Sequence, residues 1–325
     1  MQLTGGILIQ GGLNLISGGS SPSPEPYAPV QGSNFGYATG GLTPSPGGGI
    51  LSNVIEKFPF SSDANATDVG DLVVSRYLAA GQSSTTNGYS SGGRLTPTSF
   101  SNDIDKFSFS SDGNATDVGD LTVNRQTRAG QSSSASGYTS AGRNNQITPE
   151  YINVIDKFPF ASDGNAVDVG DLTREITNAG AQSSTVSGYT SGGQWPVVNI
   201  IDKFPFASDS NATDVGDLAV PATDQAGQSS STSGYNAGGF DTTKTSTIEK
   251  FPFSSDANAT DVGDLTVARY APAGQSSTAS GYASGGNTTL GIVNTIDKFP
   301  FASDGNATDV GDLINAQQQQ AGQQY

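Results

Sequence analysis

One phrase returns six times along this chain of 325 residues and constrains its fold more than any other feature. It reads Asp/Glu-Lys-Phe-Pro-Phe, with Ser for Pro in one copy, and continues as Asp-x-Asn-Ala-x-Asp-Val-Gly-Asp-Leu. The copies lie 46–51 residues apart, and their first Phe residues are Phe58, Phe107, Phe158, Phe204, Phe251 and Phe299. A repeat of this period indicates stacked supersecondary units.

Two further phrases divide each unit into four short predicted strands. Gly-Gln-Ser-Ser predicts the first strand, and Gly-Tyr-x-x-Gly-Gly predicts the second. An apolar run such as residues 153–160 predicts the third, and a run such as residues 115–123 predicts the fourth. The 43 Gly and 16 Pro residues interrupt every window long enough for an amphipathic helix. Because Pro cannot donate to a ladder, Phe-Pro-Phe is expected at a strand end or an edge.

The two ends of the chain predict a closed ring. The repeat region begins just before a second-strand phrase, and it ends with Ala321-Gly322-Gln323, which resembles the start of a first strand. Pairing these ends would complete one blade and remove an exposed sheet edge. We therefore predict an all-β fold, a six-bladed β-propeller over residues 32–325, with a β-solenoid or fibre as the alternative. Residues 1–19 are predicted to be a Gly-rich β anchor, and residues 20–31 a Pro/Ser-rich linker.

The order Gly-Gln-Ser-Ser, Tyr-x-x-Gly-Gly and Ile-Asp-Lys-Phe resembles the kelch repeat. That family has a double glycine after its second strand, but the Trp of its fourth strand is absent here, and Val118 or Val169 lies nearby. Ser61-x-Asp63-x-Asn65-x-Thr67 resembles the Asp-box turn of sialidase-type propellers. The whole repeated phrase also resembles repeats in virion structural proteins of marine tailed phages such as cyanophages, which implies a fibre, tail or decoration protein.

The amino-acid composition argues against two classes of function, nucleic-acid binding and catalysis. A net charge of −16 leaves no basic stripe for nucleic acid. The absence of Cys and His removes thiolate chemistry, the commonest general base and the commonest transition-metal ligand. The seven Arg are scattered and form no acid–Tyr–Arg cluster within one unit, so we expect no enzyme activity, a carbohydrate-active propeller enzyme being the third hypothesis. No signal peptide or membrane-spanning segment is recognised.

The acidic phrase is the best candidate for chemistry. Asp163, Asn165, Asp168, Asp171 and their repeat equivalents offer hard oxygen ligands, which suit Ca²⁺. The alternative, which six equivalent copies favour, is turn chemistry by Asp and Asn, with no cofactor. Each Asp/Glu-Lys pair should point to opposite faces of its strand and meet partners on a neighbouring strand or blade. The alternative for these lysines is a ring that lines the central channel and binds an anion.

Two regions outside the phrase are candidates for interactions. The inserts after each double glycine vary, and Arg94, Arg143, Trp195 and Phe240 within them could form an asymmetric recognition surface on one rim. The alternative is that these loops vary because nothing constrains them. Ile7, Leu8, Ile9, Leu13, Leu15 and Ile16 form a Gly-broken strand segment that could dock on another subunit by strand addition. The alternative is that this segment packs against the propeller itself.

These observations lead to a functional expectation. The protein is expected to be a non-catalytic structural component of a multi-copy assembly, a phage virion, located in the extracellular particle. Its partners would be other virion proteins and a host-surface glycan or receptor. The alternative is a free kelch-like module that binds a protein partner.

Overall fold

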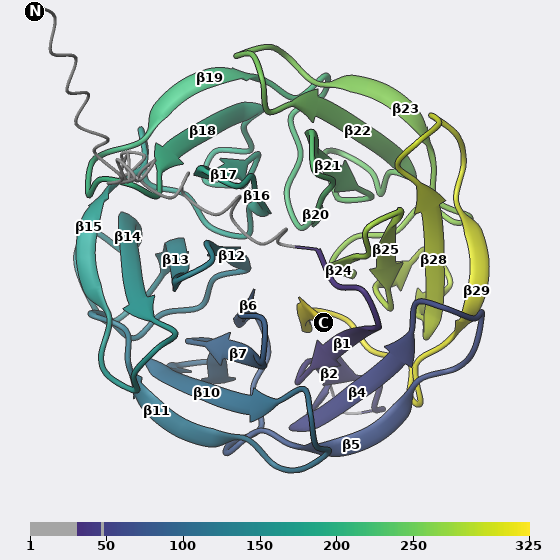
Figure 1. Ribbon diagram of the computed structural model, residues 1–325, viewed down its shortest axis with the longest axis horizontal. Helices are drawn as coiled ribbons and strands as arrows, with labels where there is room; N and C mark the ends of the chain where they lie inside the picture. Colours follow the sequence, from purple (N-terminus) through teal and green to yellow (C-terminus); the bar gives the residue numbers. More distant parts are fainter. Residues whose placement is uncertain (1–30, 47–48) are drawn as a thin grey trace, which may run out of the picture.

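The computed structural model describes residues 31–46 and 49–325, and it confirms a six-bladed β-propeller. Figure 1 shows six four-stranded sheets arranged around a central axis, with the innermost strands nearest the axis. All regular secondary structure in the described part of the chain is β-strand. No helix within these residues is long and apolar enough to cross a membrane.

Each blade is an antiparallel sheet of four strands, numbered here from the inside outward. Blade I comprises β30 (Ala321–Gln324), β1 (Phe35–Thr39), β4 (Val54–Pro59) and β5 (Thr67–Asp71). Blade II comprises β6 (Ala80–Ser83), β7 (Asn87–Ser91), β10 (Asp103–Ser108) and β11 (Thr116–Asp120). Blade III comprises β12 (Ala129–Ser132), β13 (Ser136–Arg143), β14 (Tyr151–Pro159) and β15 (Val167–Asp171).

The other half of the ring repeats this order. Blade IV comprises β16 (Gly180–Ser183), β17 (Ser187–Ser191), β18 (Ile200–Pro205) and β19 (Thr213–Asp217). Blade V comprises β20 (Ala226–Ser229), β21 (Ser233–Ala237), β22 (Thr247–Pro252) and β23 (Thr260–Asp264). Blade VI comprises β24 (Ala273–Ser276), β25 (Ser280–Ser284), β28 (Thr295–Pro300) and β29 (Thr308–Asp312). Three ribbons project from the inserts: β2 (Leu42–Thr43) with β3 (Ile50–Leu51), β8 (Arg94–Thr96) with β9 (Ser99–Phe100), and β26 (Asn287–Thr288) with β27 (Gly291–Ile292).

The ring closes through the C-terminal strand, as predicted, so the solenoid and fibre alternatives are wrong. β30 pairs antiparallel with β1, with Gly36 opposite Gln324 and Thr39 opposite Ala321. Blade I is therefore built from both ends of the repeat region, which leaves the inner edge of β1 covered. The anchor residues Ile7, Leu8, Ile9, Leu13, Leu15 and Ile16, and the predicted segments 1–19 and 20–30, lie outside the described residues.

Of two detailed strand predictions, one is confirmed and one differs from the structure. The Pro of Phe-Pro-Phe ends the third strand, as expected, for example Pro59 in β4. The fourth strand is shorter than predicted, because β11 covers only Thr116–Asp120 of residues 115–123. Gly119 has a φ of +154°, and the ladder with β10 shifts register beside it. This bulge ends the strand, and Leu121 turns into the buried core.

The hydrophobic core is divided among the interfaces between blades. Tyr138 of blade III packs against Phe204 and Phe206 of blade IV, with ring centroids 5.5 and 4.8 Å apart. Phe204 also covers Gly188 on its own blade, where a Cβ would lie 2.3 Å from the ring. The same contact returns at every interface, and Tyr282 of blade VI packs against Phe58 and Phe60 of blade I to complete the ring.

Near the axis the blades approach too closely for most side chains. A Cβ on Gly274 of blade VI would lie 2.2 Å from the carbonyl oxygen of Gly227 on blade V. Five of the six equivalent positions are glycine, and Ala181 is the exception. The next residue on each inner strand is a buried Gln that reaches the following blade, as Gln131 Nε2 donates to Tyr189 O at 2.9 Å. The repeated Gly-Gln pair therefore holds the inner strands together.

Candidate functional site

The predicted Ca²⁺ ligands lie in contacts between blades. Asn165 Oδ1 accepts a hydrogen bond from the backbone N–H of Asp120 on the preceding blade at 3.1 Å. Asp168 Oδ1 accepts from Gly170 N within its own turn at 3.1 Å, and Asp163 pairs with Lys106 of blade II. The N–H of Asp171 donates to Asn211 of blade IV at 3.1 Å. Among the described residues, no group of three or more acidic side chains could hold a metal ion.

The six repeated lysines form a second ring of contacts between blades. Lys157 on β14 pairs with Asp209 of blade IV at 2.9 Å, and Lys298 on β28 closes the circle on Asp63 of blade I at 3.2 Å. As expected, each Lys meets a partner on the next blade. The lysines lie on third strands, whereas glycine, alanine, serine and glutamine of the inner strands line the channel. A lysine ring around the channel is therefore not formed.

The acid beside each of these lysines is buried and faces the opposite way. Glu56 is 1% exposed, and Gln317 Nε2 donates to its Oε1 at 3.1 Å. Burial, only partly offset by hydrogen bonds from Asn315, Ile314 and Gln317, raises the pKa of Glu56 to about 7. The folded protein therefore holds a proton on Glu56 that the unfolded chain releases near pH 4.5.

We predict that stability decreases as the pH rises from about 4.5 to about 7. The folded state binds the Glu56 proton in this window and the unfolded state does not, so the free energy of unfolding falls by roughly 3 kcal/mol at about 1.4 kcal/mol per pKa unit. Urea unfolding at several pH values should show this slope in the wild type and a flatter one in Glu56→Gln. Gln317→Ala keeps the carboxyl group and should keep the slope. An unchanged slope in Glu56→Gln would refute the assignment.

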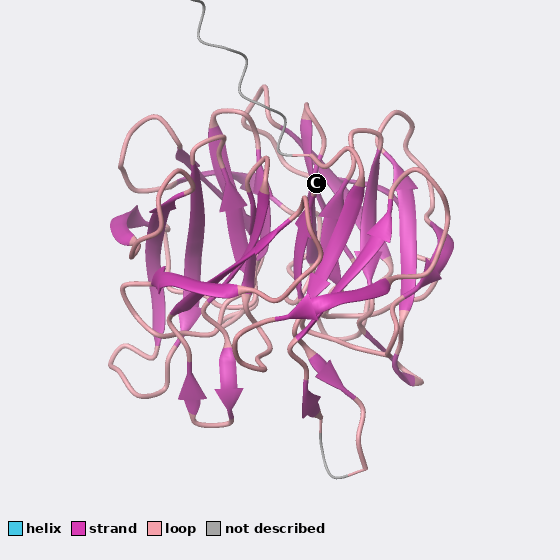
Figure 2. Ribbon diagram, turned by 60° about the horizontal axis from the view of Figure 1, so that its bottom comes forward, coloured by secondary structure: helices cyan, strands magenta, loops and turns pink. Residues whose placement is uncertain are grey.

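The predicted recognition residues lie on one face of the propeller, here called the insert rim. It carries the segments after the double glycines, residues 42–46, 49–52, 94–101, 143–151, 194–198, 240–246 and 287–292. Figure 2 shows two-stranded ribbons projecting from this face and the C-terminus at the opposite face. Each insert begins with a bridge to the segment that leads into an inner strand, for example Arg94 with Tyr77.

Blades III and IV bring two of the four predicted residues together. The Trp195 side chain lies on Tyr151, with centroids 5.8 Å apart and planes inclined by 26°. The guanidinium carbon of Arg143 lies 5.8 Å from the Tyr151 centroid, and Arg143 pairs with Glu150. Trp195 is 61% exposed and has a φ of +78°, a left-handed conformation that costs energy in a non-glycine residue.

The other two predicted residues form separate clusters. Arg94 lies over Tyr77 and Phe100, with its guanidinium carbon 5.8 Å from each ring. Phe240, 37% exposed, meets the edge of Tyr270 at 6.0 Å, and Lys244 Nζ lies 5.1 Å from the same ring. The prediction from sequence missed the tyrosines in all three clusters. The common pattern is a cation beside an aromatic residue. For Tyr77 and Tyr270 it becomes visible only when the lead-in segments are aligned with the inserts.

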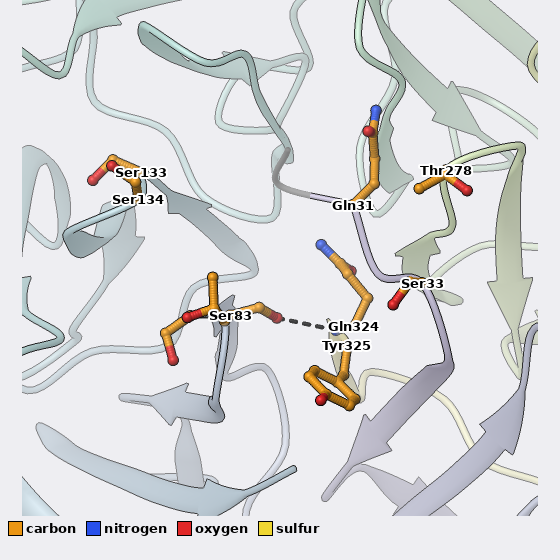
Figure 3. Close-up of a pocket in the computed structure, with 10 residues that line it drawn as sticks. Gln31, Ser33, Ser83, Ser133, Ser134, Thr278, Gln324 and Tyr325 are labelled. Carbon is orange, nitrogen blue, oxygen red and sulfur yellow. Dashed lines mark hydrogen bonds between the residues drawn. The ribbon is translucent and has the colours of Figure 1, made fainter. Parts of the chain in front are cut away.

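A hollow of about 270 Å³ lies on the face of the propeller opposite the insert rim. Figure 3 shows its lining, which includes Ser83, Ser133, Thr278, Gln324 and Tyr325. The Gln324 N–H donates to Ser83 Oγ at 3.0 Å. Gln324 takes the position that a serine occupies on the other inner strands, as Ser83 does when its N–H donates to Ser132 Oγ. Among the described residues that line this hydroxyl-rich hollow, none has a charged side chain, so the insert rim is the stronger candidate for recognition.

The sequence prediction also missed two arrangements of arginine. Arg128 pairs with Asp224 at 3.6 Å across the ring, and its guanidinium donates to Pro272 O near the axis. Three of the seven arginines share one position of the repeat, four residues before the Ala of Ala-Gly-Gln. They are Arg76, Arg125 and Arg269. Counting back from that phrase would have revealed them.

The chain matches no protein-family model and no curated protein sequence. The six-bladed propeller and the positions of its non-repeated side chains therefore carry the functional argument.

Proposed function

We propose that this protein is a non-catalytic structural component of a multi-subunit assembly, a phage virion, in which the propeller serves as an interaction module. Two observations support this role. The repeated acidic, lysine, glutamine and aromatic residues are engaged between blades, so they build the ring. The exposed, non-repeated aromatic side chain of Trp195 on the insert rim remains available to a partner. The proposed role needs no cofactor.

The stack of Trp195 on Tyr151 is the observation that carries the proposal. An indole that is 61% exposed contributes little to the core, and its backbone is held in a costly conformation. Exposed aromatic platforms with an adjacent cation suit ligands that present an apolar face and polar edges. A sugar ring of a host-surface glycan has this chemistry, with its C–H face against the indole and its hydroxyl or carboxylate groups toward Arg143.

We predict that Trp195→Ala weakens binding to host-surface glycans at least tenfold while the melting temperature stays within a few degrees. The reason is that the variant removes the stacking surface and the exposed Trp195–Tyr151 contact on the rim, but none of the buried contacts between blades. A glycan array followed by calorimetry measures both affinity and stability. Val197→Ala, at a 37% exposed position of the same insert, is the matched control and should bind normally.

The assembly part of the proposal has its own test. Mass spectrometry of purified particles should detect the protein, and a chain lacking residues 1–30 should fold normally but fail to enter particles. If the protein is absent from particles and stays monomeric with and without residues 1–30, the virion role is wrong. The free protein-binding module then becomes the better account, and the exposed Leu290 and Ile50 on the ribbons, 98% and 60% exposed, favour it.

A further inference from the structure

The residue type at one position of the repeat differs among the blades. This position lies on the segment that leads into the inner strand, four residues before the inner-strand Ala in most units. Blades II, III and VI place an arginine there, blade I a glutamine and blade IV an isoleucine. Blade V alone has the small residue alanine. These residues are Arg76, Arg125, Arg269, Gln317, Ile176 and Ala222.

The arginines show what this position does. Arg76 is fully buried, and its Nη2 lies 2.5 Å from Asp105 Oδ2, the buried acid of the third strand. In blade VI the Arg269 Nη2 lies 3.0 Å from Asp297 Oδ2 in the same arrangement. Because an uncompensated buried carboxylate is costly, the guanidinium neutralises the acid in the blade where both lie.

In some blades a threonine hydroxyl also donates a hydrogen bond to the buried acid of the third strand. In blade IV the Thr173 hydroxyl and N–H both donate to Asp202, and Ile176, at the position of the arginine, is buried. The equivalent residue in blade V is Ala219, which has no hydroxyl group. Glu249 of blade V, 5% exposed, therefore receives the Val220 N–H at 3.2 Å but has neither a threonine hydroxyl nor a guanidinium beside it. In the described part of the chain, no cation lies within 4 Å of it.

A cavity of about 180 Å³ occupies the space that the missing arginine would fill. One water needs only about 10–15 Å³ of such space, so the cavity has room for a group the size of a side chain. Its lining includes Ala222, Gln225, Glu249, Gly238, Thr245 and Thr247. On the insert rim side it is bounded by Asp241 and by the exposed Thr243.

The lining repeats the acceptors that a guanidinium uses elsewhere in this chain. In blade II, Arg76 Nη1 donates to Gly92 O at 3.1 Å, to Asp103 O at 3.2 Å and to Ser101 Oγ at 3.5 Å. The equivalent residues of blade V are Gly238, Thr247 and Thr245, and all three line the cavity. Gln225 adds a buried Oε1 with no hydrogen-bond partner among the described residues. The cavity therefore combines one buried carboxylate with several further acceptors.

We propose that this cavity of blade V binds a guanidinium group supplied from outside the blade, either as a free guanidino compound or as an arginine side chain of a partner protein. The planar group would take the place that Arg76 occupies in blade II, with its N–H donors directed at Glu249 and at the acceptors above it. This site is separate from the Trp195–Tyr151 stack, so the inference does not depend on the proposed function.

Isothermal titration calorimetry with methylguanidinium and with an acetylated arginine amide tests the proposal. Methylammonium at the same ionic strength serves as the comparison. The wild type should bind one equivalent with a Kd on the order of 1 mM or tighter. Glu249→Gln should weaken binding at least tenfold. Equal affinity for both probes would indicate a free ligand, whereas binding of the arginine amide alone would indicate a partner's side chain.

Two variants that copy other blades provide the controls. Ala222→Arg reproduces blade II, and Ala222→Ile reproduces blade IV, so each should fill the cavity and abolish binding of both probes. Their melting temperatures show whether they are folded, and Ala222→Ile remains informative if the arginine variant does not fold. Binding that is unchanged in a folded Ala222 variant, or no saturable binding of either probe to the wild type, would overturn the proposal.

Discussion

A chain that ends at Gln320 should lose the cooperative unfolding of the ring. Removing residues 321–325 deletes β30, the inner strand of blade I, and exposes the inner edge of β1. It also removes the Gln323 hydrogen bond to Tyr89 O at 2.9 Å, which ties blade I to blade II. The Tyr325 ring, stacked on Phe109 at 5.2 Å, is lost as well. Since domains are stable by only about 5–15 kcal/mol, the loss of one closing strand should remove most of that stability.

Circular dichroism during heating and the radius of gyration in solution measure this effect. The truncated chain should melt broadly at a much lower temperature and have a larger radius than the full chain. A circular permutant provides the control: it joins Tyr325 to Asn34 and opens the chain in the turn between Ser83 and Asn87. It keeps every strand, so it should melt cooperatively. A truncated chain that melts like the full chain would show that β30 is dispensable.

The second large effect is expected for Phe204→Ala. This side chain is 1% exposed, covers Gly188 of its own blade and contacts Tyr138 of the preceding blade. Its removal leaves a cavity at an interface and should cost about 3–5 kcal/mol, as for other buried aromatic residues. Urea unfolding should show a lower midpoint with a similar slope, provided that the ring still unfolds as one unit.

Phe240→Ala is the matched control for this prediction. Phe240 is 37% exposed on the insert rim and takes no part in the packing of Tyr against Phe pairs between blades. Its truncation should change the free energy of unfolding by roughly 0.5 kcal/mol or less. If the two variants were equally destabilised, the blade interfaces would not be the main source of stability.

The fold could be predicted because the same sequence phrases form the same strands in all six blades. The Gly-Tyr-x-x-Gly-Gly phrase and the Pro at the end of Phe-Pro-Phe predicted strands and their ends, and Ala321-Gly322-Gln323 predicted closure. The partners of the polar residues could not be predicted. Asn165 bonds the backbone of Asp120, 45 residues earlier, and no local pattern reveals which blade a turn will face.

The candidate sites were less predictable than the fold for a related reason. Trp195 was recognised by its uniqueness, but its stack on Tyr151 depends on how two variable inserts meet. The cavity beside Glu249 arises from what is missing at Ala222 and Ala219. Such an absence has meaning only after the six blades are superposed and their filled positions are known.

The repeated Tyr, Lys and Gln contacts between neighbouring blades all run in one direction around the ring. The Tyr, Lys and Gln side chains of one blade reach the Phe pair, the Asp and the backbone of the next, and none of these contacts is reciprocal. In the language of assemblies this is a heterologous interface, repeated by rotation until it returns to its start. A single chain here does what a cyclic hexamer of separate blades would do. The rotation built into that interface, rather than the structure of any blade, therefore sets how many copies make a closed ring.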